Sequence, residues 1–295
     1  MHRRQFLKLF FSVLGAACPT VSMARSLRIQ SDDQGPVPHA ANTPHRFLFS
    51  PDVHDSAVKD LLFTEDNHQY PVVNDIYVSG PDIALFHSSL ARLKRLMKIV
   101  GYANFSLLGF DTAVKTAKSY SAIGAFSKRE LEFLEGLYNT PASVYGFLGD
   151  RTASDLTDMI QKKQIQKIPN TGHYLFRGKS LDMYDTICSK IGSDVVLTSG
   201  VRGIVKQFYL FLNKARSCDL NLSLASRSLA PPGYSFHGIG DFDVGKRGFG
   251  VSNFTVAFTR TNVYDRLAGL GFVKFRYPPK NNLGVRFEPW HIEVI

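Results

Sequence analysis

Two short polar stretches near the C-terminus constrain this chain more than any other feature. One runs Ser235-Phe-His-Gly-Ile-Gly-Asp-Phe-Asp243 and the other is Glu288-Pro-Trp-His291. Together they supply two imidazoles and three carboxylates, which is what one zinc ion and one general base require. A fold that brings both stretches together therefore forms a metal centre, and the rest of the chain would export, support or orient it.

The residue types within these stretches suggest separate roles. His237, Asp243 and His291 are candidate zinc ligands, because a catalytic zinc ion takes three protein ligands and leaves one position open. Glu288 lies three residues before His291, where its carboxylate can take a proton from water and pass it to a leaving amine. Each residue alone is a weak signal. An isolated histidine is more often hydrogen-bonded on the surface, and a single tryptophan such as Trp290 more often belongs to the core.

Composition favours a folded, basic protein. The 295 residues are 44% hydrophobic and 20% charged, which excludes a disordered or fibrous chain. The formal net charge is +10, or +7 without the three basic residues Arg3, Arg4 and Lys8. Such a surplus suits contact with an anionic polymer or surface. We find no zinc-finger spacing, basic helix or aromatic–basic RNA motif, so we predict no nucleic-acid partner and favour the bacterial cell wall.

Residues 1–24 are predicted to be an export signal peptide. Arg3-Arg-Gln-Phe-Leu-Lys8 resembles the twin-arginine export motif, and the apolar run that follows is too short to span a bilayer. Ser22-Met-Ala24 has the small residues of a signal-peptidase site. Lipid attachment at Cys18 is the alternative. Since no later apolar run is long enough for a membrane helix, the mature chain is predicted to lack one and to act in the periplasm or cell envelope.

The remaining chain divides into regions that differ in composition and in the periodicity of apolar residues. Residues 25–50 are polar and contain three prolines, which predicts an extended linker. Residues 51–168 are predicted to be a mainly helical accessory region, with an amphipathic helix from 81 that stops at Gly101, a helix that opens at the capping box Ser127–Glu130, and a third helix over 152–166. Residues 169–295 are predicted to mix helices at 180–191, 204–215 and 262–269 with strands at 195–198, 222–225, 249–258 and 285–295.

Four blocks in fixed order resemble the zinc D-alanyl-D-alanine carboxypeptidases of the VanY type, within the LAS metallopeptidases. The resemblance covers roughly residues 170–295 and implies an α+β fold, with a small antiparallel sheet and flanking helices after the mainly helical region. The blocks are Ser199-Gly-Val-Arg202 followed by Gln207, Pro232-Gly-Tyr-Ser-Phe-His237 with Gly240 and Asp243, Gly271-Phe-Val-Lys-Phe-Arg-Tyr-Pro278, and Glu288-Pro-Trp-His291.

The resemblance also implies a role for each matching position. Arg202 is similar to the arginine that binds the substrate carbonyl oxygen, where a fixed positive charge stabilises an oxyanion. Gln207 and Ser235 match positions that hold the terminal carboxylate of the substrate. Trp290 is expected to form a wall behind a ligand histidine. The ligands and the base carry over as His237, Asp243, His291 and Glu288, with Zn²⁺ as the cofactor.

The activity implied is zinc-dependent hydrolysis in the stem peptide of peptidoglycan, with release of a terminal D-alanine. Two alternatives remain open. One is an endopeptidase that cuts a cross-link or another stem-peptide bond. The other is a catalytically inactive protein that binds the cell wall.

The spacing of the first ligand pair departs from the family. The family usually has six residues between the first histidine and the aspartate, whereas five separate His237 from Asp243. On a regular strand this change would turn the aspartate to the opposite face. Gly238 and Gly240 give the backbone freedom to absorb it. Asp241 is the alternative ligand, and Asp243 is preferred for its hydrophobic neighbours.

Overall fold

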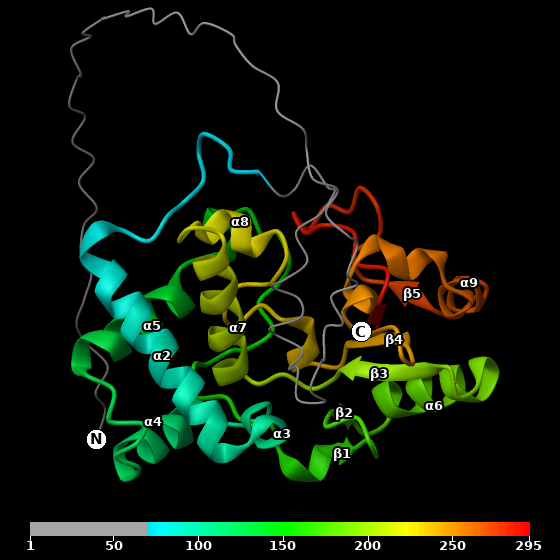
Figure 1. Cartoon of the computed structure of the whole chain (residues 1–295), viewed down its shortest axis with the longest axis horizontal. Coiled ribbons are helices and arrows are strands. Elements are labelled where there is room, and N and C mark those ends of the chain that lie inside the picture. Colours follow the sequence, from blue (N-terminus) through cyan, green and yellow to red (C-terminus); the bar gives the residue numbers. More distant parts are fainter. Residues whose placement is uncertain (1–69) are drawn as a thin grey trace, which may run out of the picture. The chain divides into compact units, whose positions relative to one another are not determined.

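The computed structural model describes residues 70–295 (Figure 1). The predicted signal peptide, the predicted linker over 25–50 and the first part of the accessory region lie outside the described residues. Residues 70–295 all belong to one compact unit. Within them, no helix combines the length and the apolar character needed to cross a bilayer.

The first part of the described chain is helical, as predicted. Its α-helices are α2 (Ile83–Val100), α3 (Tyr102–Phe105), α4 (Phe110–Ser119) and α5 (Lys128–Asn139). Short 3-10 turns occur at Gly80–Asp82, Ala142–Tyr145 and Lys162–Gln164. The apolar stripe of α2, which includes Phe86, Leu93 and Leu96, is buried, and each such side chain contributes about 1.5–3 kcal/mol of burial free energy.

The capping box at the start of α5 forms as the sequence predicts. The Ser127 hydroxyl accepts a hydrogen bond from the Glu130 backbone N–H at 3.2 Å, and the Ser127 N–H donates to the Glu130 carboxylate at 2.7 Å. The same buried carboxylate pairs with Arg92 of α2 at 3.2 Å. Glu130 therefore both caps the start of α5 and connects α5 to α2.

Replacing Glu130 with alanine should lower the free energy of unfolding by about 3 kcal/mol, because Arg92 then loses its buried partner and α5 loses half of its cap. Burial raises the pKa of Glu130, but the Ser127 N–H and Arg92 outweigh it, and the pKa lies below its usual value. The stabilisation is thus present above the unfolded-state pKa and disappears as the pH falls through the lower folded-state pKa. Urea unfolding at neutral and acidic pH measures both effects.

The matched control is Glu132→Ala on the same helix. Glu132 pairs with Lys128 at 3.5 Å, and both side chains are exposed, so its loss should change the free energy of unfolding by less than about 0.5 kcal/mol. Equal unfolding midpoints for the two variants would contradict the structural role of Glu130.

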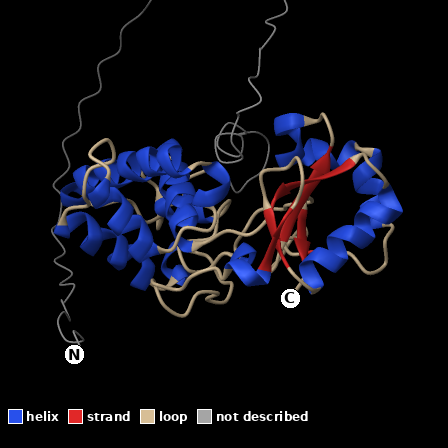
Figure 2. Ribbon diagram, turned by 90° about the horizontal axis from the view of Figure 1, so that it is seen from below, coloured by secondary structure: helices blue, strands red, loops and turns tan. Residues whose placement is uncertain are grey.

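The second part of the chain contains a small antiparallel sheet with the strand order β3-β4-β6-β5. Helices α6 and α9 pack together on this sheet, and their apolar side chains share one core with it (Figure 2). The predicted α+β class is therefore confirmed. The elements are α6 (Lys179–Ile191), β3 (Val195–Ser199), β4 (Phe242–Lys246), α9 (Asn262–Ala268), β5 (Lys274–Phe275) and β6 (His291–Glu293), preceded by a hairpin of β1 (Ile165–Lys167) and β2 (Tyr174–Phe176).

The register of the sheet brings candidate site residues together on its central strands. On β4, Asp243 lies opposite His291 of β6 on one side and opposite Ser199 of β3 on the other. Residues far apart in the sequence are thereby brought side by side on three neighbouring strands. The backbone pairing of the sheet, rather than a flexible loop, fixes their spacing.

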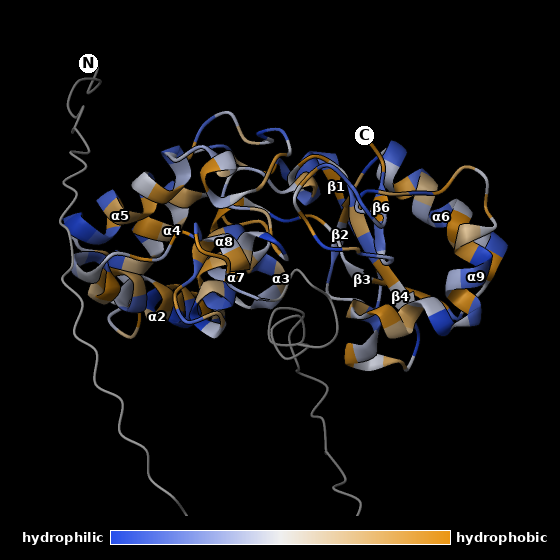
Figure 3. Ribbon diagram, turned by 90° about the horizontal axis from the view of Figure 1, so that it is seen from above, coloured by the Kyte–Doolittle hydropathy of each residue, from blue (hydrophilic) through white to orange (hydrophobic). Residues whose placement is uncertain are grey.

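Helix α7 (Ile204–Ser217) is buried from Ile204 to Ala215. It packs against α2 and α4 and continues into α8 (Leu222–Ser226), and its apolar side chains belong to the core of the helical part (Figure 3). The core of the helical part thus draws on residues from both sides of position 168.

Three predicted elements are wrong in type. Residues 152–166 do not form the expected helix, because the backbone N–H groups of Thr152 and Ala153 bond to the carbonyl of Gly233. The expected strand at 222–225 is α8, since the Asn221 side chain caps it through the Leu224 N–H at 2.7 Å. The expected strand at 249–258 consists of two 3-10 turns, Gly250–Phe254 and Val256–Arg260. The last strand covers only His291–Glu293 of the expected 285–295.

Candidate metal centre

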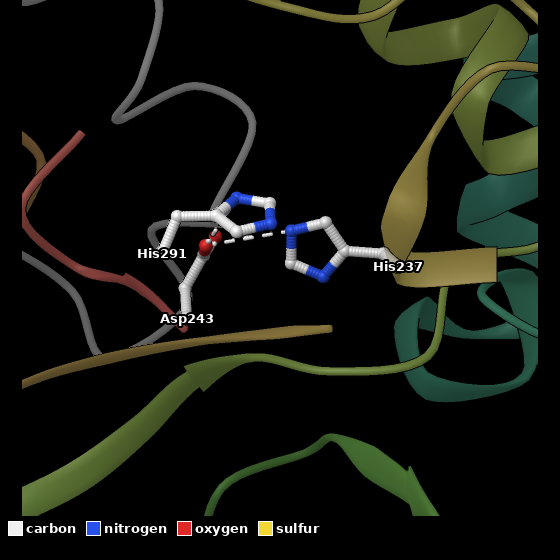
Figure 4. A group of neighbouring side chains, drawn as sticks. All are labelled: His237, Asp243 and His291. Atoms are coloured by element: carbon white, nitrogen blue, oxygen red, sulfur yellow. Dashed lines mark ion pairs between the residues drawn. The ribbon is translucent and has the colours of Figure 1, made fainter. Parts of the chain in front are cut away.

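His237, Asp243 and His291 come together in a buried cluster whose candidate ligand atoms all lie within 4.8 Å of one another (Figure 4). The Nε2 atom of His237 is 3.4 Å from the Oδ1 atom of Asp243, and the Nδ1 atom of His291 is 3.3 Å from the same oxygen. The two imidazoles meet nearly edge to face, with ring centroids 4.7 Å apart. One nitrogen from each ring is thus directed at one carboxylate oxygen.

The five-residue spacing between His237 and Asp243 is accommodated by a turn before the strand. His237 sits in the 3-10 turn Phe236–Gly238, and β4 begins only at Phe242. Gly240 has a φ of 150°, and its N–H bonds back to the Phe236 carbonyl. Because the segment is not a regular strand, the alternation of faces along a strand does not apply to it.

Asp241, the alternative ligand, lies outside this cluster. Its carboxylate forms an ion pair with Arg276 at 2.8 Å and approaches the other ring nitrogen of His291, Nε2, at 3.2 Å. The structure therefore brings Asp243, and not Asp241, into the group that faces both imidazoles.

Each imidazole has a partner on the ring nitrogen that points away from the cluster. The Nδ1 atom of His237 is 3.0 Å from the carbonyl oxygen of Gly200. Only glycine fits at position 200, because a Cβ atom there would come within 2.0 Å of the Tyr174 carbonyl. Burial and the charge of Arg202 lower the pKa of His237 to about 3, so this ring is neutral and its Nε2 lone pair is available.

The surroundings of His291 raise its pKa, whereas those of His237 lower the pKa of that ring. Burial lowers its pKa, but the hydrogen bonds to Asp241 and Glu288 and the charge of Asp243 outweigh burial and raise the pKa to about 9. A cation that binds at this ring therefore displaces a proton. The concentration of negative charge around His291 is what a divalent cation would neutralise.

Glu288 lies at the edge of the cluster. Its Oε2 atom is 3.5 Å from His291 Nδ1, and its Oε1 atom is 3.9 Å from Arg286. The His291 N–H donates to the Glu288 carbonyl at 3.2 Å, so Glu288-Pro-Trp-His291 forms a local turn. This turn places Glu288 and His291 on the same side, which a straight strand could not do.

Arg202 brings a buried positive charge to the same place. It follows β3, and its guanidinium donates to the Ser199 hydroxyl at 3.1 Å and to the Gln207 side-chain oxygen at 3.4 Å. One nitrogen lies 4.0 Å from Asp243. Its Nε–H is buried and has no hydrogen-bond partner within the described part of the chain. The guanidinium is therefore fixed by side chains and retains donor capacity.

The other predicted substrate residues lie in different surroundings. Gln207, on α7, donates to the Ala230 carbonyl and accepts from Arg202, which leaves one amide hydrogen unused by these two contacts. Ser235 lies two residues before His237 and is buried. Trp290 is fully buried in the core of the sheet, where it packs edge to face on Phe254 with ring centroids 5.9 Å apart.

Residues 179–295 match the family model described as VanY, D-alanyl-D-alanine carboxypeptidase. This part of the chain is a VanY-family domain. The VanY domain contains the whole cluster, Arg202 and Glu288, whereas the helical part before residue 179 lies outside the match. No curated protein sequence matches the chain.

Among solved structures, the chain is similar to a zinc complex of a variant of the vancomycin-resistance D,D-pentapeptidase VanY from a VanB-type cassette. The identity is 23% and the TM-score 0.34, over 44% of this chain and 77% of that chain. It is also similar to the LD-carboxypeptidase LdcB, with 23% identity and a TM-score of 0.33, over 50% of this chain and 66% of that chain. The family assignment rests on the match of residues 179–295.

Two hollows lie near the cluster. A small one of about 20 Å³ is lined by Arg202, Ser235, His237, Tyr277, Glu288 and His291, among others. A larger cleft of about 360 Å³ shares Arg202 and Ser235 with it. Arg202 and Ser235 therefore stand between the cluster and an open cleft.

Sequence reasoning missed two parts of these walls. Tyr277 stacks edge to face on His291 with ring centroids 4.8 Å apart, and burial together with Glu288 raises its pKa well above the usual value, which keeps its hydroxyl protonated. The far wall of the larger cleft comes from residues 152–164, outside the VanY domain. Tyr277 lies within a block that resembles the family, but the resemblance assigns no role to it. The segment 152–164 contains no motif.

Proposed function

We propose that this protein is a zinc-dependent peptidase that releases the terminal D-alanine from peptidoglycan stem peptides. The observation that carries the proposal is the convergence of two ring nitrogens on one Asp243 oxygen, with Glu288 and Arg202 at the edge of the same hollow. This convergence occurs within a VanY-family domain. The function shared by that family supplies the substrate class.

The donor set fits the metal. His237, Asp243 and His291 offer two imidazole nitrogens and a carboxylate oxygen, a combination that zinc accepts. Both histidines have acceptors on their outer nitrogens, as ligating histidines generally do. Bound there, zinc would supply Lewis acidity to the scissile carbonyl and would lower the pKa of water to about 7.

The protein's own residues supply the rest of the reaction. The Glu288 carboxylate accepts a proton from the attacking water as the new C–O bond forms. It then gives this proton to the leaving amine as the C–N bond breaks. Arg202, fixed by Ser199 and Gln207, stabilises the negative charge that develops on the carbonyl oxygen. The Ser235 hydroxyl and the remaining Gln207 amide hydrogen hold the substrate's terminal carboxylate.

The cellular location follows from the substrate. Peptidoglycan lies outside the cytoplasmic membrane, so we place the activity in the periplasm or cell envelope. Residues 1–24 would supply the export signal.

Metal content and product identity together test this function. The purified protein should contain about one equivalent of zinc and should release free D-alanine from muropeptides that end in D-Ala-D-Ala, as seen by mass spectrometry. Removal of the metal with a chelator should abolish release, and added zinc should restore it. Protein without zinc that still binds muropeptides would instead support the non-catalytic wall-binding alternative.

The larger cleft favours an endopeptidase as the second candidate. Its volume of about 360 Å³ exceeds what a single alanine residue needs, and it extends beyond Arg202 along residues 152–164. A bulkier group on that side of the scissile bond would fit there. In the same digestion, release of cross-linked partners without free D-alanine would favour this activity over the carboxypeptidase.

A further inference from the structure

The carboxylate of Asp241 occupies a defined place behind the metal centre. Its Oδ2 atom is 3.2 Å from the Nε2 atom of His291, on the side of the ring that faces away from Asp243. The opposite nitrogen, Nδ1, faces the Asp243 oxygen at 3.3 Å. The His291 ring therefore lies between two carboxylates that contact different nitrogens.

Asp241 is itself held rigidly by donors on both of its oxygens. Arg276 donates to Oδ2 from Nε at 2.8 Å and to Oδ1 from a terminal nitrogen at 3.2 Å, while the Val294 N–H donates to Oδ1 at 2.9 Å. The carboxylate is almost completely buried. A two-pronged pair of this kind fixes orientation as well as position.

Arg276 is fixed in turn by its surroundings. Its guanidinium lies over the Phe236 ring at 4.2 Å and pairs with Glu293 at 3.5 Å. Phe236 directly precedes His237, and Glu293 is on the same strand as His291. The pair Asp241–Arg276 therefore connects the segments that carry the two histidines.

We infer that Asp241, held by Arg276, is a positioning residue that keeps the proton of His291 on Nε2 and so directs the Nδ1 lone pair toward zinc. Neutral histidine carries one N–H, and carboxylates lie beside both nitrogens of His291. Zinc at Nδ1 would exclude the proton from that nitrogen, so the proton would stay on Nε2, where Asp241 accepts its hydrogen bond. His237 is the mirror case, since the Gly200 carbonyl next to its Nδ1 leaves Nε2 free for the metal. The two ligands are thus held in opposite tautomers. This inference rests on the proposed zinc site.

Zinc affinity and the tautomer of His291 test the inference in the full-length protein. In Asp241→Ala the zinc dissociation constant, measured by competition with a chromogenic chelator, should rise about 10- to 100-fold. Asp241→Asn should lie between this variant and the wild type, because its amide oxygen can still accept from Nε2–H. Asp265→Ala, which removes an exposed aspartate on α9, is the matched control and should bind zinc as the wild type does.

Nitrogen NMR of the zinc-loaded wild type, labelled with ¹⁵N in its histidine rings, gives a second readout that needs no variant. His291 should show a protonated Nε2 and a metal-bound Nδ1. Wild-type zinc affinity in Asp241→Ala, or a protonated Nδ1 in His291, would overturn this inference alone. A wild-type protein that takes up no zinc would overturn the proposed function and this inference with it.

Discussion

Glu288→Gln should lower kcat for release of D-alanine by about 1,000-fold while one equivalent of zinc stays bound. The amide has nearly the shape of the carboxylate but cannot accept the proton of the attacking water, and general acid–base catalysis contributes about 10²–10⁴ to a rate. The Oε2 atom of Glu288 is 3.5 Å from His291 Nδ1, so the group lies beside the cluster without belonging to the three proposed ligands. Steady-state kinetics and metal analysis of the same preparation measure both quantities.

The control for this prediction is Glu135→Gln, which changes an exposed glutamate on α5 and should leave kcat unchanged. Wild-type turnover in Glu288→Gln would show that another group moves the proton. Loss of zinc together with turnover would show that Glu288 is a ligand, and the assignment of the three ligands would then be wrong.

Asp243→Ala should abolish activity by removing the metal. Its Oδ1 atom faces both imidazoles, at 3.4 Å and 3.3 Å. Its loss should weaken zinc binding by more than about 100-fold, the upper end of what loss of an outer partner costs. The substitution also removes the carboxylate that lies 4.0 Å from Arg202. This negative charge would then no longer balance the positive charges of the guanidinium and the metal.

Comparison with Asp241→Ala makes the second prediction specific. If Asp243 is a ligand and Asp241 only positions one, the zinc dissociation constant must rise more in Asp243→Ala than in Asp241→Ala. Isothermal calorimetry of both metal-free variants decides the order. The reverse order would make Asp241 the ligand and would require a different arrangement of the loop from His237 to Asp243.

The sequence predicted the helices whose signals are local, and it named the candidate ligands that lie together in the structure. The apolar stripe of α2 and the capping box of α5 depend on residues within one or two turns, and both formed as expected. The candidate ligands are likewise tied to short motifs. Their assembly in one buried cluster could be inferred only from the order of the four blocks, because pairing of Asp243 with His291 joins strands far apart in the chain.

The features that the sequence did not predict depend on particular contacts, some of them between residues far apart in the chain. Residues 152–161 lack helical hydrogen bonds because Thr152 binds Gly233, which lies some eighty positions away. The sequence preferred Asp243 and left Asp241 as the alternative ligand, and it gave no sign that Asp241 pairs with Arg276, thirty-five positions away. The expected strand at 222–225 became α8 because one side chain, Asn221, caps it. The pattern of apolar and polar residues does not reveal which of these contacts will form.

The burial of α7 on all sides has a consequence for how this protein can be divided. The helix starts two residues after Arg202 and carries Gln207, yet its apolar side chains fill the core of the helical part. The stretch that bears the family likeness is therefore shorter than the stretch that must fold together. A fragment cut at residue 179 would keep the ligands, the base and the arginine. It would also expose to water the apolar side chains of α7, the helix that carries Gln207, a hydrogen-bond partner of Arg202.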